Sequence, residues 1–120
     1  MPALMIHQIH DVTVVNFNET SILDTVQVDQ LGKQLDELVD KQACRKILLD
    51  FAKVKLLSSS ALGVLVTLQK KTRQIKGRAA ICSLRPELRK VFKITSLDKL
   101  FDFYDDEAGG LASFGATAAG

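Results

Sequence analysis

Apolar residues along the chain follow two different periods, and their alternation predicts an α/β fold. Residues 4–9 and 12–17 are rich in apolar and β-branched side chains and flank a polar turn at Asp11, which is typical of a pair of strands. The run Ile47–Leu49 contains no polar residue, so it predicts a central strand that is covered on both faces. We expect the short apolar segment Ala79–Cys82 to lie beside it as a second buried strand, parallel to the first.

A helical period of apolar residues separates these strands. Asp24 is a preferred N-cap residue, and Gln27 three positions later completes a capping-box pattern. The pattern predicts a one-sided helix of about 18 residues that begins after Asp24. The apolar residues that recur at helical spacing along it are Val28, Leu31, Leu35, Leu38 and Val39.

A second helix is predicted to begin within Ser58–Ser60, because serine is a preferred N-cap residue and an apolar run follows directly. Residues 61–68 are apolar almost throughout, whereas residues 69–76 are polar and basic. We therefore expect buried first turns and exposed last turns, with Gly77 as the residue that ends the helix.

The last third of the chain predicts two more helices and one strand. Pro86 fits the first position of a third helix, which would carry Leu88, Val91 and Phe92 along one side. Residues 101–104 predict a last edge strand. The acidic run that follows them, Asp105-Asp106-Glu107, suits the start of a short fourth helix because negative charge is favourable there.

Together these elements predict one α/β domain over residues 1–114, with a mixed, mostly parallel β-sheet flanked by about four α-helices. The strand pair at the beginning would give the sheet an antiparallel edge. Residues 115–120 are small and carry no charge, and we expect them to form a flexible tail.

The formal net charge of +2 is unevenly distributed along the chain. Residues 51–100 contain 12 basic and 2 acidic residues, whereas residues 1–50 and 101–120 each have a net charge of −4. Phe92 is the one aromatic residue among the basic residues, and its spacing places it in the core, so no platform for stacking nucleic-acid bases is predicted. We expect the basic side chains to decorate exposed helix faces, at Lys70, Lys71, Arg73, Lys76, Arg89, Lys90 and Lys93.

The sequence lacks the motifs of common catalytic and cofactor sites: it has no nucleophile elbow, no phosphate-binding loop and no dinucleotide fingerprint. His7 and His10 would point to opposite faces of an edge strand, and Cys44 and Cys82 are too few for a four-ligand zinc site. No apolar run approaches the roughly 20 residues that span a membrane, and no signal-peptide pattern is present. We expect a cytoplasmic protein that is not an enzyme, that binds no metal, no cofactor and no nucleic acid, and that does not insert into a membrane.

The serines Ser58–Ser60 can be interpreted in two ways. One of them can cap the second helix while the others are spare, or the group can be a point of modification or binding, because a helix start presents free N–H groups and favours negative charge. Chemistry alone leaves both interpretations open. A third interpretation, Ser59 as an enzymatic nucleophile, lacks a base in the sequence pattern.

The central part of the chain resembles the STAS domain family, which includes the bacterial anti-sigma factor antagonists. The resemblance rests on a hydrophobic strand that ends in Asp50, on the serines, and on Leu62, Gly63 and Leu65 in the helix that follows. The segments 84–92 and 94–101 also look like the family's C-terminal pattern, so that the resemblance covers about residues 4–108. Ser58 stands where the family usually has Asp, and Ala61 stands where it usually has Gly.

The resemblance implies a partner-switching regulator without catalysis of its own. Its partner would be an anti-sigma factor that is also a serine protein kinase, and a serine phosphatase would reset the switch. Ser59 would be the phosphorylated residue, with Ser58 and Ser60 as alternatives. We expect the partner-binding residues to be Asp24, Ser58, Ser59, Ser60, Ala61 and Leu62. The alternative function is a STAS-type scaffold, or a subunit of a transport or stressosome-like complex, without a phosphorylation switch.

Overall fold

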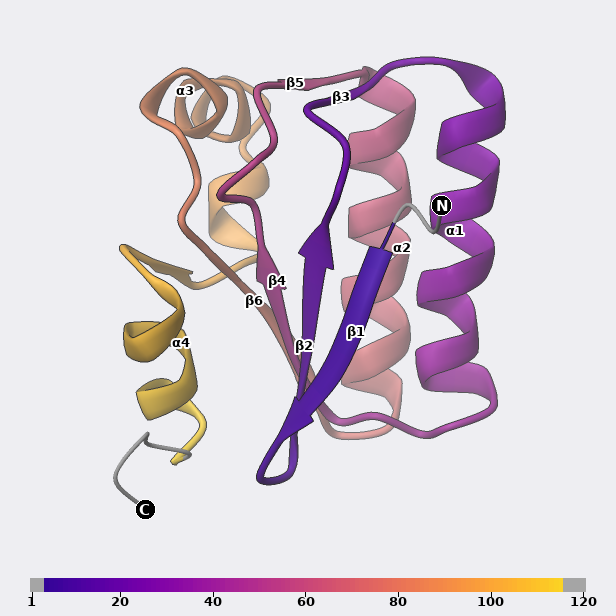
Figure 1. Ribbon diagram of the computed structural model, residues 1–120, viewed down its shortest axis with the longest axis vertical. Helices are drawn as coiled ribbons and strands as arrows, with labels where there is room; N and C mark the ends of the chain where they lie inside the picture. The colour runs from indigo at the N-terminus through magenta and orange to yellow at the C-terminus, as the bar shows by residue number, and fades with distance from the viewer. Residues whose placement is uncertain (1–3, 116–120) are drawn as a thin grey trace.

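The computed structural model describes residues 4–115, where strands and helices follow one another largely in the predicted order (Figure 1). The strands are β1 (Leu4–Ile9), β2 (Val12–Phe17), β3 (Ser21–Ile22), β4 (Lys46–Asp50), β5 (Leu56–Leu57), β6 (Arg78–Cys82) and β7 (Phe103–Tyr104). The helices are α1 (Thr25–Asp40), α2 (Ser59–Gln74), α3 (Pro86–Ile94) and α4 (Glu107–Ser113), with a short 3-10 turn, η1 (Leu97–Lys99). Residues 116–120, most of the predicted tail, lie outside the described residues.

The main sheet has five strands in the order β1-β2-β4-β6-β7. β1 and β2 are antiparallel, and the other neighbours are parallel. Ile47 pairs with Ala79 and Leu49 with Ile81, all four of them buried, which confirms the two central parallel strands predicted from their apolar sequences. The mixed, mostly parallel sheet is therefore confirmed.

Side chains alternate between the two faces of this sheet and build two separate cores. Helices α1 and α2 lie side by side over one face, and α4 lies over the other (Figure 1). Val15, Ile47 and Leu49 face the larger core, whereas Val14 and Leu48 face the smaller core beneath α4. The central strands read as continuous apolar runs because both of their faces are covered.

Three details of the predicted elements are wrong. Gly77 does not end α2: Lys76 takes the left-handed conformation with φ of 64°, and Gly77 is needed because a Cβ there would overlap the backbone of Arg45. Val91 is 36% exposed, so the buried side of α3 contains only Leu88 and Phe92. His10 lies in the β1–β2 turn with φ of 56° rather than on a strand.

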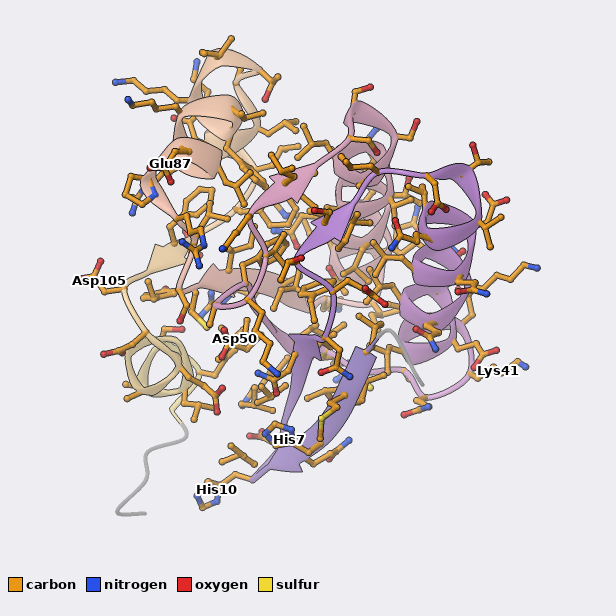
Figure 2. All side chains as sticks on the ribbon, turned by 45° about the horizontal axis from the view of Figure 1, so that its top comes forward. His7, His10, Lys41, Asp50, Glu87 and Asp105 are labelled. Carbon is orange, nitrogen blue, oxygen red and sulfur yellow. The ribbon has the colours of Figure 1, made fainter. Side chains whose placement is uncertain are left out.

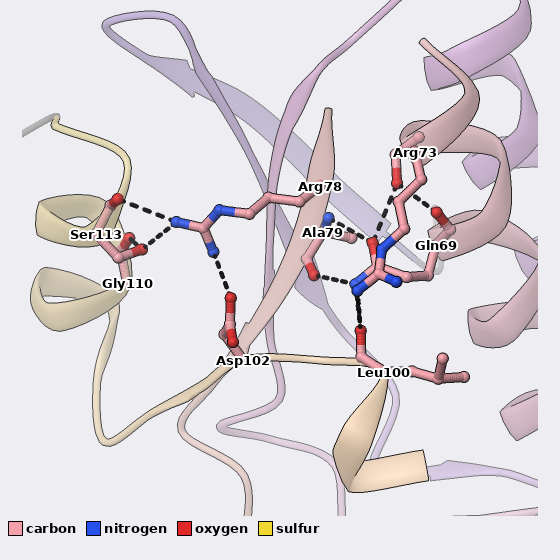
Figure 3. Close-up of polar contacts among 9 residues, drawn as sticks. Gln69, Arg73, Arg78, Ala79, Leu100, Asp102, Gly110 and Ser113 are labelled. Carbon is pink, nitrogen blue, oxygen red and sulfur yellow. Dashed lines mark hydrogen bonds and ion pairs between the residues drawn. The ribbon is translucent and has the colours of Figure 1, made fainter. Parts of the chain in front are cut away.

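Gln69 is the largest departure from the predicted pattern, because it is buried although the last turns of α2 were expected to be exposed. Its amide reaches the edge of β6 at a position that β7 does not cover (Figure 3). The side-chain oxygen accepts a hydrogen bond from the Ala79 N–H at 2.8 Å, and the side-chain nitrogen donates to the Ala79 carbonyl at 3.0 Å and the Leu100 carbonyl at 2.7 Å. One side chain thus replaces the backbone of a missing strand neighbour.

Replacing Gln69 by Leu should destabilise the protein by about 2–6 kcal/mol, because two buried backbone groups of Ala79 lose their partners at about 1–3 kcal/mol each. Gln74→Leu, at an exposed position of the same helix, is the matched control and should change the free energy of unfolding by less than about 0.5 kcal/mol. Urea unfolding of both variants measures the difference. Equal stabilities would show that Gln69 does not act as a substitute strand.

Candidate functional site

The starts of α1 and α2 lie at the same end of the molecule, and the two-stranded sheet β3–β5 connects them (Figure 1). Ser21 pairs with Leu56 and Ile22 with Leu57, in parallel. Directly beyond this pair, the Ser58 N–H donates to the Ile22 carbonyl at 3.0 Å. The N-cap residues of the two helices, which are far apart in the sequence, therefore follow two strands that are hydrogen-bonded to each other.

The start of α1 is built as the sequence predicts. The Asp24 carboxylate accepts a hydrogen bond from the Gln27 N–H at 2.8 Å, and the Gln27 side-chain oxygen accepts from the Asp24 N–H at 3.4 Å. This capping box occupies Asp24 with the backbone of its own helix. Asp24 remains exposed, at the same end of the molecule as the serines.

The three serines at the start of α2 have different roles. Ser58 is the N-cap residue, and its hydroxyl accepts a hydrogen bond from the Ala61 N–H at 3.1 Å. Ser59 and Ser60 are the first two helical residues and are exposed, while Ser58 is half-buried. The backbone N–H groups at such first positions have no acceptor within the helix. Ser59 therefore carries an accessible hydroxyl beside free N–H groups.

Burial narrows the set of residues that we expect to contact a partner. Ala61 is 0% exposed and Leu62 is 6% exposed, because both side chains point from α2 into the larger core. These two side chains anchor the start of α2 in the core and are not accessible to a partner. The accessible predicted residues are Asp24, Ser59 and Ser60, with Ser58 partly covered.

The same end of the molecule also carries exposed apolar residues that the sequence analysis did not single out. Leu23 is 51% exposed, Val26 65% and Leu56 53%. We call these three residues the apolar rim. Leu23 and Val26 fall outside the apolar stripe of α1, a signal that could have identified them, whereas Leu56 depends on the unpredicted strand β5.

A groove of about 450 Å³ runs between α1 and α2 from this surface. Gly32 and Asp36 line it from α1, and Ser60, Gly63, Val64 and Thr67 line it from α2. A Cβ on Gly63 would meet nothing within 4 Å, so the groove is open at that glycine. The exposed residues Asp24, Ser59 and Ser60 together with the apolar rim form what we call the helix-start surface. Ser60 therefore lies both on this surface and at the beginning of the groove.

Asp50, the last residue of β4, lies on the same face of the sheet as Leu48 and points toward α4 (Figure 2). It is 8% exposed, and its carboxylate accepts the Ala52 N–H at 2.9 Å. A hydrogen bond between the carboxyl groups of Asp50 and Glu107 is the main cause that raises the pKa of Glu107, followed by burial. Asn16 and His7 act in the opposite direction. Burial raises the pKa of the nearby Cys82 thiol to about 12, so that this thiol is not a ready nucleophile.

Within residues 4–115 there is no group of three or more His, Cys, Asp or Glu side chains that could hold a metal ion. None of the helices in this part of the chain is long and apolar enough to cross a membrane.

Comparison with known proteins gives the family. The profile of the STAS domain matches residues 3–110. The chain belongs to the STAS domain family. The anti-sigma F factor antagonist of Paenibacillus polymyxa is 29% identical over 89 residues, which cover 74% of this chain and 76% of that protein.

Solved structures share the fold of this STAS domain. An anti-sigma-factor antagonist domain protein from Planctomyces limnophilus matches with a TM-score of 0.83 and 24% identity, over 94% of this chain and 98% of that one. The Bacillus cell fate determinant SpoIIAA in its phosphorylated form matches with a TM-score of 0.73 and 18% identity, over 93% of this chain and 99% of that one.

The geometry explains how this STAS domain accommodates Ser58 in place of the family's usual Asp. Serine and aspartate are both strong N-cap residues, since each offers an oxygen to the N–H groups of the first turn. Ser58 makes that hydrogen bond, so the helix start is kept while one negative charge is lost. The exchange changes the charge beside Ser59 rather than the local fold.

The cap gives a test of the division of roles among the serines. Ser58→Ala should destabilise the domain by about 1 kcal/mol, because α2 loses its N-cap hydrogen bond. Ser58→Asp should keep most of the stability. Ser59→Ala is the matched control and should leave the free energy of unfolding nearly unchanged. If urea unfolding shows a larger loss of stability for Ser59→Ala than for Ser58→Ala, Ser58 is not the residue that caps α2.

The Asp50–Glu107 pair predicts a pH dependence. Because the pKa of Glu107 is raised in the folded state, its contribution to stability is fully present below its ordinary pKa of 4.5 and is lost as the pH rises through the raised value. Glu107→Gln removes this titration, and its amide can donate to Asp50 at every pH. The stability of Glu107→Gln relative to wild type should therefore increase between pH 4 and pH 7.

Asp105→Asn, at an exposed position just before α4, is the control for removing a charge near the helix start. Unfolding of wild type and both variants at pH 4, 5, 6 and 7 measures the effect. If the two variants follow the same pH profile, the carboxyl pair does not influence stability.

Proposed function

We propose that this STAS domain is an anti-sigma factor antagonist that works by partner switching. Its unphosphorylated form binds an anti-sigma factor that is also a serine protein kinase, and phosphorylation of Ser59 weakens that binding. One observation carries the proposal: Ser59 is exposed on the first turn of α2, at the end of the molecule where the start of α1 and the apolar rim also lie. The relatedness to an anti-sigma F factor antagonist supports it.

Ser59 is the best phosphate acceptor of the three serines. The Ser58 hydroxyl is engaged as the cap, so phosphorylating it would also disturb the helix start. Ser60 is exposed but also lines the α1–α2 groove. A phosphate on Ser59 adds about −1.5 to −2 charge next to the positive end of the helix dipole, which tolerates it. Phosphorylation should therefore leave the fold intact.

The chemistry of the surrounding surface explains how a phosphate would act as a switch. Leu23, Val26 and Leu56 favour contact with an apolar partner surface, because burying exposed apolar area is favourable. A phosphate group at the same end would have to lose its water when a partner covers it, which is costly without a new counter-charge. Bulk and charge at Ser59 thus oppose docking without any change in the fold.

The remaining features fit a regulator better than an enzyme. No histidine or carboxylate is hydrogen-bonded to the Ser59 hydroxyl among the described residues, so nothing there activates it as a nucleophile. Six of the seven basic residues predicted to decorate helix faces are exposed, and Lys71 is half-buried. We assign them to solubility and long-range attraction of a partner. The kinase and a serine phosphatase would complete the cycle in the cytoplasm.

The switch predicts that two substitutions of the same shape at Ser59, one charged and one neutral, differ in their effect on partner binding. Ser59→Asp should weaken partner binding at least about tenfold, equivalent to about 1.4 kcal/mol, while Ser59→Asn, of the same shape without the charge, should bind nearly as wild type. Pull-down from a lysate of the source organism, with mass spectrometry of the captured proteins, identifies the kinase. Titration with that purified kinase then gives the affinities.

Incubation of the protein with this kinase and ATP, followed by mapping of the modified residue, tests the acceptor directly. Wild type should take up one phosphate on Ser59, and Ser59→Ala should take up none there. If no serine in Ser58–Ser60 is modified and Ser59→Asp binds as well as wild type, the switch is wrong. The scaffold alternative then explains the domain better.

A further inference from the structure

β1 forms one edge of the main sheet, and this edge is open. Its six residues, Leu4–Ile9, pair with β2 on the inner side along the whole strand, from Leu4 opposite Phe17 to Ile9 opposite Val12. No other strand in residues 4–115 pairs with its outer side. The opposite edge of the sheet is β7, which has only two residues and so offers little to pair with.

The β1 edge has none of the features that normally prevent pairing between molecules. Such edges are usually protected by charged residues, proline or a bulge. The sequence of β1 contains no Asp, Glu, Lys or Arg and no proline, and its register with β2 is continuous. It also carries exposed apolar side chains on both faces, since Met5 is 57% exposed and Ile6 is 43% exposed.

We propose that β1 pairs with β1 of a second copy of this chain, antiparallel and about a twofold axis centred on Ile6. A twofold axis perpendicular to the sheet keeps each face continuous, so residues of one face meet residues of the same face. Centred on Ile6, it places the two Ile6 side chains next to each other on the α1–α2 face. On the α4 face, Met5 of one copy meets His7 of the other.

The composition of the strand favours a second copy as the occupant. Self-pairing brings like residues together, so an edge rich in Lys, Arg, Asp or Glu would repel itself. Leu4–Ile9 contains none of these residues and pairs Ile6 with Ile6 at its centre. A single strand pair is a small interface, and interfaces below about 1,200 Å² are weak and transient. We therefore expect a dimer that forms with rising concentration. The β1 edge shares no residue with the helix-start surface.

Sedimentation velocity from about 10 µM to about 1 mM tests the dimer, a range that spans weak association constants. Wild type should shift from monomer toward dimer, and Ile6→Lys should stay monomeric because two lysines would face each other. Leu56→Lys, at an equally exposed apolar residue of the apolar rim, should dimerise as wild type does. A wild type that stays monomeric overturns the proposal, and so does a dimer that Leu56→Lys abolishes and Ile6→Lys does not.

Cysteine cross-linking tests the register and does not depend on a charged substitution. In the proposed dimer, Ile6→Cys places two thiols opposite each other, within reach of a disulfide. Gln8→Cys lies on the same face, but its two copies are about four residues apart along the strands, roughly 13 Å, and cannot be bridged. The native Cys44 and Cys82 are buried. Oxidation should give a covalent dimer of Ile6→Cys only. Equal cross-linking of both variants would rule out the register, and none in either would rule out the pairing.

Discussion

The short sheet β3–β5 determines where the candidate site is. It has only two residues per strand, yet it ties the segment before α1 to the segment before α2. The hydrogen bond from the Ser58 N–H to the Ile22 carbonyl continues this pairing to the first residue of the cap. Without this link, the segments that lead to Asp24 and Ser58 would be two separate loops. The serines, the capping box and the apolar rim form one surface because the two segments that lead into α1 and α2 are hydrogen-bonded to each other.

Within that surface, structure and switching are assigned to different residues. Ser58 satisfies the N–H groups of α2, and Ala61 and Leu62 anchor the same turn in the core. Ser59 contributes to neither task, so its hydroxyl can change chemically at little cost to stability. The separation explains why a modification here can alter recognition without altering the fold. Asp50 and Glu107 lie on the other side of the sheet, beneath α4, where the contact with Asp50 raises the pKa of Glu107.

Sequence reasoning succeeded where a local pattern determines a local structure. The apolar run Ile47–Leu49 predicted a buried central strand, and Asp24 with Gln27 predicted a capping box; both are confirmed. It failed where a distant segment decides the environment of a residue. Gln69 is polar and stands among basic residues in the sequence, which predicts exposure. It is buried because β7 is too short to cover β6 at Ala79, and the Gln69 amide binds the Ala79 backbone there instead. β3 and β5 are too short to carry a period, so the link between the helix starts could not be predicted.

The fold places some basic residues from the middle of the chain next to acidic residues from the segments before and after it. Lys71, from the basic middle of the chain, lies between Asp36 at 3.4 Å and Asp40 at 2.9 Å, and Arg78 pairs with Asp102 at 3.1 Å (Figure 3). Arg78 also donates to the Ser113 carbonyl at 3.0 Å and covers the Phe114 ring at 4.0 Å, which holds the end of α4 against the sheet.

Exposed ion pairs each contribute less than about 1 kcal/mol, so these contacts orient segments more than they stabilise them. They link the basic middle of the chain to both acidic segments, residues 1–50 and residues 101–120. Part of the charge asymmetry of the sequence therefore serves to orient α1 relative to α2, and α4 relative to the sheet.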